Sequence, residues 1–309
     1  MPSTEFICPD QERISIEQCL TRGGCRMPER CANLPYLRFI AYDREWRGIT
    51  PSSAGNGPLL IALKKEKPYA ISPDSRTFAV LGTGVHGKLG LDAYSFDVIS
   101  EELITDIDGM KGTPDCFEPD ENQEGCAELV DYKTYGSYKV AKLIGIVATE
   151  KPLLDADGKP YIWFKSGPRK GQPKTETIFT RDPERAETRD VELQLNRYRI
   201  MFSHKNPTPI SRLKLIVYVR DGGTQVAKSR GIDRNLYVIP VNFLPDEEVL
   251  GYYQNLTREV DEILAHNFTR YGRLCNAWEC WDGRRCQGFC EVSDYCKEIT
   301  NRPDNWKGK

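Results

Sequence analysis

The sequence predicts an α/β fold in which helices surround a small mixed sheet. Helical and strand-like apolar spacings alternate along the middle of the chain, in the order helix, strands, helix, strand, helix. Of the 309 residues, 39% are hydrophobic, which is enough to bury the core of one large domain or two ordinary ones. The sequence contains no internal repeat, so a repeat architecture is not expected.

The individual elements follow from the same spacing. Five segments have the apolar period of a helix: 32–46, 57–67, 77–96, 189–204 and 244–268. Three segments have the pattern of a strand: 102–120, 126–136 and 212–223. Residues 139–148 fit either a helix or a strand, and 1–31 contain enough breakers to predict loops.

Three consecutive parts are expected along the chain. Residues 1–76 form an N-terminal cysteine-rich and helical segment, and residues 77–243 form the core. Residues 244–309 contribute a C-terminal helix and a cysteine-rich tail. Within the core, a basic stretch rich in glycine and proline separates two apolar runs, which predicts an inserted hairpin at about 157–180.

The charge balance excludes a globally basic nucleic-acid-binding protein. Lys and Arg total 43 and Asp and Glu total 45, so the formal net charge is −2. Any contact with nucleic acid must therefore come from a local basic patch. No apolar run approaches the ~18 residues of a membrane span, and the first residues lack a secretory signal pattern. We expect a cytoplasmic protein with no membrane partner.

The eleven cysteines are concentrated at the two ends of the chain. Four lie within the first 31 residues and five within the last 35. Without a secretory route, clustered cysteines indicate metal or cluster ligands more often than disulfides. Their distribution also suggests that the two termini meet in space. Cys116 and Cys126 lie outside both groups and are expected to act as small hydrophobic residues.

A short motif in the core predicts catalytic chemistry. In "AELVDYKTYG", Asp131 and Lys133 are two residues apart, so their side chains leave a strand on the same face. The simplest alternative is a surface ion pair. However, Asp115 lies on the preceding predicted strand, and a hairpin would bring the two carboxylates together. Such oxygens bind Mg²⁺ or Mn²⁺, His86 could complete the metal shell, and Lys133 could hold the attacking water.

Four motifs in series then resemble a known family. "GTGVHGKL", "GTPDCF", "ELVDYKTY" and "QLNRYRIMF" occur in the order found in the RecB-type branch of the PD-(D/E)xK nucleases, which includes the CRISPR-associated Cas4 proteins. The resemblance covers roughly residues 77–222. It implies a restriction-endonuclease-like core and a metal-dependent DNA nuclease, either an exonuclease or an end-processing enzyme.

The resemblance also assigns roles to individual residues. The catalytic set that it implies is Asp115, Asp131, Lys133, Gln194 and Tyr198. The Mg²⁺ or Mn²⁺ ligands that it implies are His86, Asp115 and Asp131, with the backbone carbonyl of Tyr132 as a further candidate. Gln194 and Tyr198 are four residues apart and therefore share one face of the predicted helix.

Some members of this branch hold a [4Fe–4S] cluster with one N-terminal and three C-terminal cysteines. Carried over to this chain, the cluster ligands are Cys31, Cys286, Cys290 and Cys296. The C-terminal spacing is C-x3-C-x5-C, one residue longer in its first gap than the family pattern. Zinc fits four thiolates equally well. The remaining terminal cysteines could supply a second metal site: Cys8, Cys19, Cys25, Cys275 and Cys280.

The predicted hairpin has the composition of a single-strand contact surface. It combines cationic side chains with an aromatic ring: Lys165, Arg169, Lys170, Lys174 and Trp163. A solvated loop is the simpler alternative. The expected partner is DNA, as single strands or duplex ends, together with proteins of recombination, repair or CRISPR adaptation.

Two other classes of function remain open. The first is a non-catalytic nucleic-acid-binding or assembly subunit with structural zinc. The second is an iron–sulfur redox protein, although the radical-generating C-x3-C-x2-C triplet is missing. The chain also lacks a GxxxxGK[ST] phosphate-binding loop, so it has no motor of its own.

Overall fold

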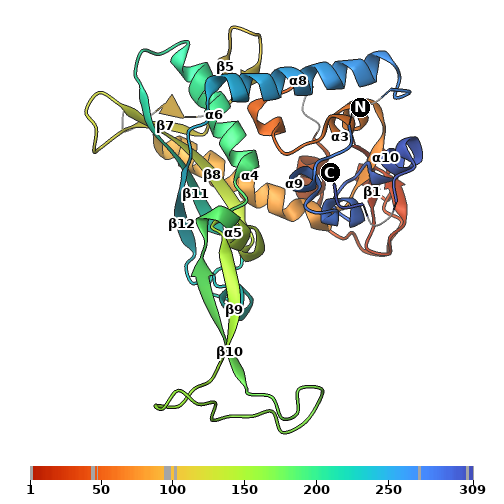
Figure 1. Ribbon diagram of the computed structural model, residues 1–309. Helices are drawn as coiled ribbons and strands as arrows, with labels where there is room; N and C mark the ends of the chain where they lie inside the picture. The colour runs from red at the N-terminus through yellow and green to blue at the C-terminus, as the bar shows by residue number, and fades with distance from the viewer. Residues whose placement is uncertain are drawn as a thin grey trace. The chain divides into compact units, whose positions relative to one another are not determined.

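The computed structural model describes residues 3–42, 46, 48–93, 99–100, 103–270, 273–303 and 306–308. It is a mixed α/β structure with small sheets and flanking helices (Figure 1). The chain forms two compact units. Unit 1 contains Met1–Tyr132, Arg189–Lys214 and Pro240–Lys309, and unit 2 contains Lys133–Thr188 and Leu215–Ile239. These interleaved units differ from the three consecutive parts predicted.

The largest sheet has five strands in the order β12-β11-β8-β7-β4. Their bounds are Ile99–Ser100 for β4, Cys116–Pro119 for β7, Ala127–Tyr135 for β8, Ile210–Val219 for β11 and Leu236–Val241 for β12. β7 pairs antiparallel with both β4 and β8. The strand predicted at 126–136 is confirmed as β8, and the one predicted at 212–223 corresponds to β11. The single strand predicted at 102–120 is wrong in extent, because only Cys116–Pro119 forms β7 and two shorter strands precede it.

Three helices enclose the main core of unit 1. They are α3 (Pro58–Glu66), α6 (Arg189–Ser203) and α8 (Asp246–Ala265), and Figure 1 shows α8 running beside α3. All three were predicted from apolar spacing. Proline at the first position starts α3, and three acidic residues in the first turn favour the N-terminal end of α8. The inward faces contribute Leu63, Leu193 and Leu256 to one buried cluster.

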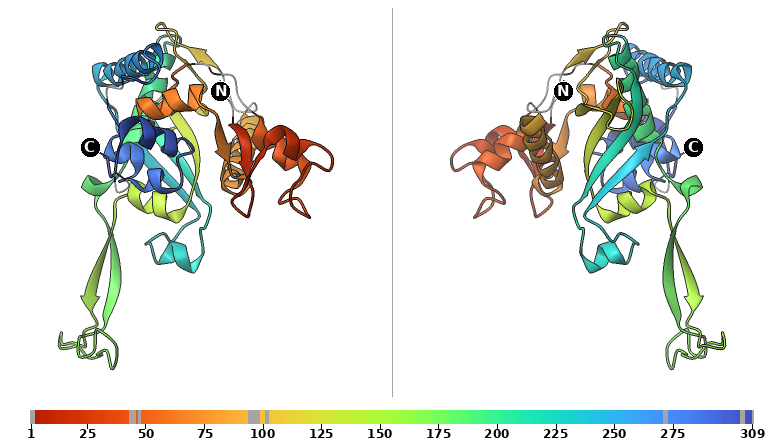
Figure 2. Two further views of the ribbon diagram at one scale, coloured as in Figure 1. Left: turned by 90° about the vertical axis from the view of Figure 1, so that its right-hand side faces the viewer. Right: turned by 90° about the vertical axis from the view of Figure 1, so that its left-hand side faces the viewer.

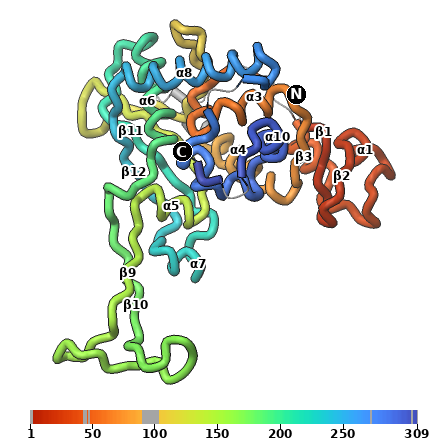
Figure 3. Tube along the Cα trace, turned by 45° about the vertical axis from the view of Figure 1, so that its right-hand side comes forward, coloured from red at the N-terminus to blue at the C-terminus, as the bar shows by residue number. Residues whose placement is uncertain are grey.

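Residues 3–41 form a small lobe of unit 1 together with β3 (Figure 3). β1 (Ser3–Ile7) lies between β2 (Arg13–Ser15) and β3 (Tyr69–Ile71). Helices α1 (Ile16–Leu20) and α2 (Leu34–Ala41) pack beside this sheet. The prediction of loops across 1–31 therefore missed two strands and one helix, because each is five residues or shorter. Helix α2 is shorter than the predicted 32–46.

The rest of unit 1 consists of one long helix and several short elements. α4 (Pro73–Ala93) begins at a proline and contains the helix predicted at 77–96 up to the last described residues. The short elements are the hairpin β5 (Ile104–Thr105) and β6 (Lys111–Gly112), the C-terminal helices α9 (Ala277–Cys280) and α10 (Ser293–Thr300), and the single turns η1 (Pro51–Ser53) and η3 (Arg284–Gln287).

Unit 2 is built around an antiparallel hairpin of β9 (Ile146–Pro152) and β10 (Thr175–Arg181), seen edge-on in Figure 2. Its other elements are α5 (Ser137–Leu143), η2 (Pro183–Arg185) and α7 (Gln225–Lys228). The ambiguous segment 139–148 thus contains both a helix and a strand. The predicted hairpin exists, but it starts earlier than 157–180: β9 lies before this range, whereas β10 begins inside it. Most of the connecting loop 153–174 is exposed.

None of the helices in the described ranges is both long enough and apolar enough to cross a lipid bilayer.

Candidate functional site

The β7–β8 hairpin brings the two predicted carboxylates to the same place. Cys116 pairs with Val130 in the antiparallel ladder, and one step further in this register Asp115 stands opposite Asp131. The backbone N–H of Tyr132 donates to Oδ2 of Asp115 at 2.7 Å. Opposite residues of an antiparallel pair project to the same face. Asp115 therefore contacts the part of β8 that carries Asp131 and Tyr132.

His86 reaches the same carboxylate from α4. Its Nδ1 lies 3.1 Å from Oδ1 of Asp115, and both side chains are partly exposed. The ring of Tyr132 meets the imidazole edge to face, with centroids 6.1 Å apart. Because a hydrogen bond at Nδ1 fixes the tautomer of a neutral imidazole, this arrangement leaves the lone pair on Nε2.

Asp131 lies deeper, below this pair. Its side chain is only 2% exposed, and Oδ1 accepts a hydrogen bond from Nε2 of Gln194 on α6 at 3.1 Å. Lys133 is the next residue on the same side of β8 and is partly exposed. Asp131 and Gln194, predicted from separate motifs, are thus in direct contact.

Tyr198 has different surroundings from Gln194, although both lie on α6. It is 4% exposed, and a Cβ added to Gly112 would lie 2.7 Å from its ring. Tyr198 therefore packs closely against the β5–β6 hairpin. Cys116 is also buried, as expected for a small hydrophobic residue, and burial raises the pKa of its thiol to about 11.

Glu128 belongs to a separate ion cluster on the other face of β8. It is buried and pairs with Arg212 at 2.6 Å and with Lys214 on β11. Arg212 also pairs with Asp120, and together with the hydroxyl of Ser211 it lowers the pKa of that carboxyl. These contacts fix the start of β8 against β11 and do not include the Asp131 face.

The donor types near Asp115 suit a hard divalent cation, because His86 contacts Asp115 and Asp131 lies on the adjacent strand. Within the described ranges, no three His, Cys, Asp or Glu side chains already stand in the geometry of a bound metal ion. Bringing Asp131 into a shared shell with His86 and Asp115 would therefore need side-chain adjustment around the ion.

The loop between β9 and β10 places the predicted cations at the surface of unit 2. Lys165, Arg169, Lys170 and Lys174 are exposed, and Trp163 is 47% exposed. Arg169 and Lys174 both lie over the ring of Phe164, at 5.8 and 6.0 Å from its centroid. Cations and aromatic rings thus lie beside one another on one exposed loop, as the sequence predicts.

The C-terminal cysteines line one pocket of unit 1. Its thiols belong to Cys275, Cys280, Cys286, Cys290 and Cys296. Cys31 does not line this pocket, so the predicted set of Cys31, Cys286, Cys290 and Cys296 is not brought together. The tail instead meets the N-terminal half of the chain through α3 and the start of α4, where Lys64 and Arg76 pair with Glu291.

Two details distinguish the thiols of the C-terminal pocket. Cys280 donates to the carbonyl of Ala277 at 3.6 Å, within its own helix. Cys275 approaches α3 so closely that a Cβ on Gly57 would lie 2.6 Å from its Sγ. Burial raises the pKa of Cys275 to about 12 and also raises those of Cys286 and Cys290. Of the five thiols, Cys280 is the one that is hydrogen-bonded within its own helix.

Arg302 supplies a buried positive charge to the same pocket. It is 6% exposed and donates to the carbonyl and hydroxyl oxygens of Ser293 at 3.2 and 2.6 Å. Burial opposes its charge, but a hydrogen bond with Cys296 and the nearby Cys286 raise its pKa overall. A buried guanidinium among thiols stabilises their ionised forms. Sequence patterns missed Arg302, because single arginines are common in polar tails.

No protein-family model and no curated protein matches this chain. Among solved structures, one described as "Crystal structure of SSO0001" aligns with 85% of this chain and 92% of that chain. The sequence identity is 15% and the TM-score is 0.39, which is too low to support a conclusion about fold or function.

Proposed function

We propose that the protein is a metal-dependent DNA nuclease of the PD-(D/E)xK type, with a restriction-endonuclease-like core. The observation that carries this proposal is the convergence of residues from four separate motifs. His86 contacts Asp115, Asp115 stands opposite Asp131, and Asp131 accepts a hydrogen bond from Gln194. These contacts are not needed to stabilise the β7–β8 hairpin. A partly exposed pair such as His86 with Asp115 contributes little to the free energy of folding.

The residues of this site have three roles, which are binding the metal ion, positioning its ligands and orienting the attacking water. His86, Asp115, Asp131 and the carbonyl of Tyr132 would hold Mg²⁺ or Mn²⁺. When bound, such an ion polarises a phosphoryl oxygen and lowers the pKa of its water. Gln194 holds Asp131 in its buried rotamer, and Tyr132 fixes Asp115 through its N–H. Lys133, on the same face as Asp131, orients the attacking water and offsets negative charge at the phosphate.

Cleavage of end-labelled DNA with Mn²⁺, with Mg²⁺ and with EDTA tests this proposal. We expect cleavage with either ion and none in EDTA. Asp115→Asn should remove most activity, whereas Glu118→Gln should not, because Glu118 lies on the opposite face of β7. A covalently closed circular substrate separates endonucleases from exonucleases, since only an endonuclease cuts it. A protein that binds DNA but cuts none of these substrates would be a non-catalytic subunit, and the proposal would fail.

We also propose that the C-terminal pocket holds a [4Fe–4S] cluster through Cys275, Cys286, Cys290 and Cys296. Four thiolates suit this cluster, and zinc is the alternative. The proposal is supported by Arg302, whose buried positive charge balances an anionic thiolate centre. The cluster therefore draws all of its ligands from the tail, without Cys31.

Anaerobic purification with elemental analysis should find about four iron atoms per chain in this pocket. Cys290→Ser should lose the iron and lower the melting temperature, because the free energy of cluster binding contributes to folding. Cys280→Ser is the matched control and should retain iron, since that thiol is bonded to its own helix. Zinc in place of iron would change the cofactor and leave the nuclease proposal untouched.

A further inference from the structure

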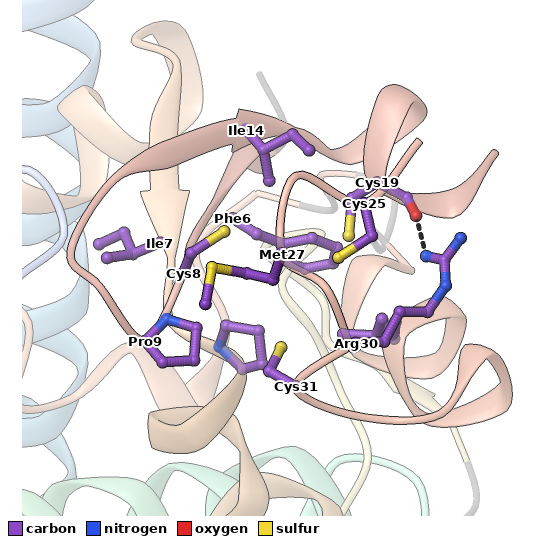
Figure 4. A pocket seen from close by; sticks show the side chains of 12 residues that line it. Phe6, Ile7, Cys8, Pro9, Ile14, Cys19, Cys25, Met27, Arg30 and Cys31 are labelled. Atoms are coloured by element: carbon purple, nitrogen blue, oxygen red, sulfur yellow. Dashed lines mark hydrogen bonds between the residues drawn. The ribbon is translucent and has the colours of Figure 1, made fainter. Parts of the chain in front are cut away.

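A second group of cysteines surrounds a separate pocket in the N-terminal lobe. Cys8 follows β1, Cys19 lies in α1, and Cys25 and Cys31 lie in the turns before α2. Figure 4 shows these four side chains around the same cavity. They come from one continuous stretch of chain, so this pocket does not depend on the C-terminal tail.

The side-chain donor atoms that line this pocket are almost all sulfur. Besides the four thiols, its lining is apolar apart from Arg30 and includes Phe6, Leu37 and Met27. No carboxylate or imidazole belongs to this lining. An all-thiolate donor set selects soft or borderline metals, and four thiolates form a closed structural site for Zn²⁺. The spacings are wider than those of zinc fingers, because a sheet and a helix separate the ligands.

The four thiols also influence one another. Burial, followed by the neighbouring Cys25, raises the pKa of Cys19, and burial together with Cys8 raises that of Cys31. All four are free cysteines rather than disulfides in the structure.

The apolar core of the lobe is small, so it contributes little stability by itself. Its buried cluster has six members, and two of them are Cys8 and Cys19. The three strands have five residues or fewer, and α1 has five. Small scaffolds of this kind require disulfides or a metal. Arg30 joins the ligand turns to α1 by donating to the carbonyls of Cys19 and Thr21.

We propose that Cys8, Cys19, Cys25 and Cys31 bind one structural Zn²⁺, separate from the C-terminal cluster and from the catalytic ion. Binding replaces up to four thiol protons by one cation and draws the sulfurs to about 2.3 Å from it. No three ligands stand in that geometry within the described residues, so metal binding tightens the turns that carry Cys25 and Cys31. The zinc therefore fixes α2 against the small sheet.

Zinc and iron analysis of the full-length protein tests this inference without reference to DNA cleavage. We expect one zinc per chain in the parent protein. Cys25→Ser should lose zinc and keep iron, whereas Cys290→Ser should do the reverse. Cys126→Ser, outside both pockets, should keep both metals. A zinc-free parent protein, or Cys25→Ser with full zinc, would overturn the proposal.

A second measurement covers the case in which Cys25→Ser does not fold. The parent protein is refolded with Co²⁺ in place of zinc, and its visible spectrum is recorded. A tetrahedral thiolate site gives intense absorption bands that added Zn²⁺ abolishes. Absence of these bands, or mass-spectrometric detection of a disulfide among the four N-terminal cysteines, would contradict a zinc site. Iron bound in this pocket instead of zinc would do so equally.

Discussion

Asp131→Asn is expected to lower the rate of DNA cleavage by about 10³-fold while the protein remains folded. Removing one ligand charge costs the transition state several kcal/mol of metal-centred stabilisation, and about 4 kcal/mol corresponds to 10³ in rate. Asparagine keeps the size of the side chain and one oxygen that can accept from Gln194. Single-turnover cleavage at saturating Mn²⁺ measures the loss.

Gln194→Ala is expected to lower the rate of DNA cleavage less than Asp131→Asn does. It removes only the hydrogen bond that positions Asp131. Outer-shell partners of this kind typically contribute 10- to 100-fold in metal affinity or activity. The Mn²⁺ concentration for half-maximal cleavage should therefore rise, which a purely structural defect would not produce. If Asp131→Asn cleaved DNA as fast as the parent protein, the assignment of this site would be wrong.

Arg197→Met is expected to destabilise unit 1 by about 3–5 kcal/mol, the usual cost of breaking a buried ion pair. The Arg197 side chain is fully buried, and its Nη2 lies 2.8 Å from Asp106 and 2.5 Å from Asp108. Removing the guanidinium leaves the carboxylate of Asp106 buried without its cationic partner, beside His204 and the N–H of Ile107. Urea denaturation measures the loss of stability.

Two further variants separate the ion pair from packing. The double variant Arg197→Met with Asp106→Asn should recover part of the lost stability. It removes the carboxylate charge that the single variant leaves buried without a cationic partner. Arg258→Met is the exposed control, since its pair with Glu262 on α8 lies at the surface. A single variant as stable as the parent would show that Arg197 contributes nothing to the fold.

The same ion pair makes stability depend on pH in a defined direction. Burial raises the pKa of Asp106, but the hydrogen bond with His204, the N–H of Ile107 and the charge of Arg197 together lower it below its usual value. A depressed folded-state pKa gives stability that is complete above the unfolded value of about 3.9. That stability is lost as the pH falls through the folded pKa.

Long helices and some contacts of the candidate site were predictable from the sequence, whereas short elements were not. Helices α6 and α8 have sustained apolar spacing over 15 and 20 residues. In contrast, β12 escaped notice because Pro240 interrupts its pattern. The change from α5 to β9 was also hidden, because it depends on Gly145 in a left-handed conformation, where a Cβ would lie 2.0 Å from the carbonyl oxygen of Asp182.

The grouping of the cysteines could not be predicted for a different reason. Side-chain type and spacing identify candidate ligands, but many pairings of eleven thiols satisfy them. Cys31 precedes a helix, as the N-terminal cluster ligand does in the nucleases that the motifs resemble, yet it lines the same pocket as Cys8, Cys19 and Cys25. Only tertiary structure decides between these arrangements.

The close approach of Gly57 to Cys275 has a consequence for recognising relatives of this protein. Any larger residue at position 57 would collide with the Cys275 sulfur, so α3 could begin there only if the tail moved away. Homologues that keep the C-terminal pocket should therefore pair glycine before this helix with cysteine at the start of the tail. A sequence search that requires both the glycine and the cysteine would identify such homologues more selectively than a search for the cysteine spacing alone.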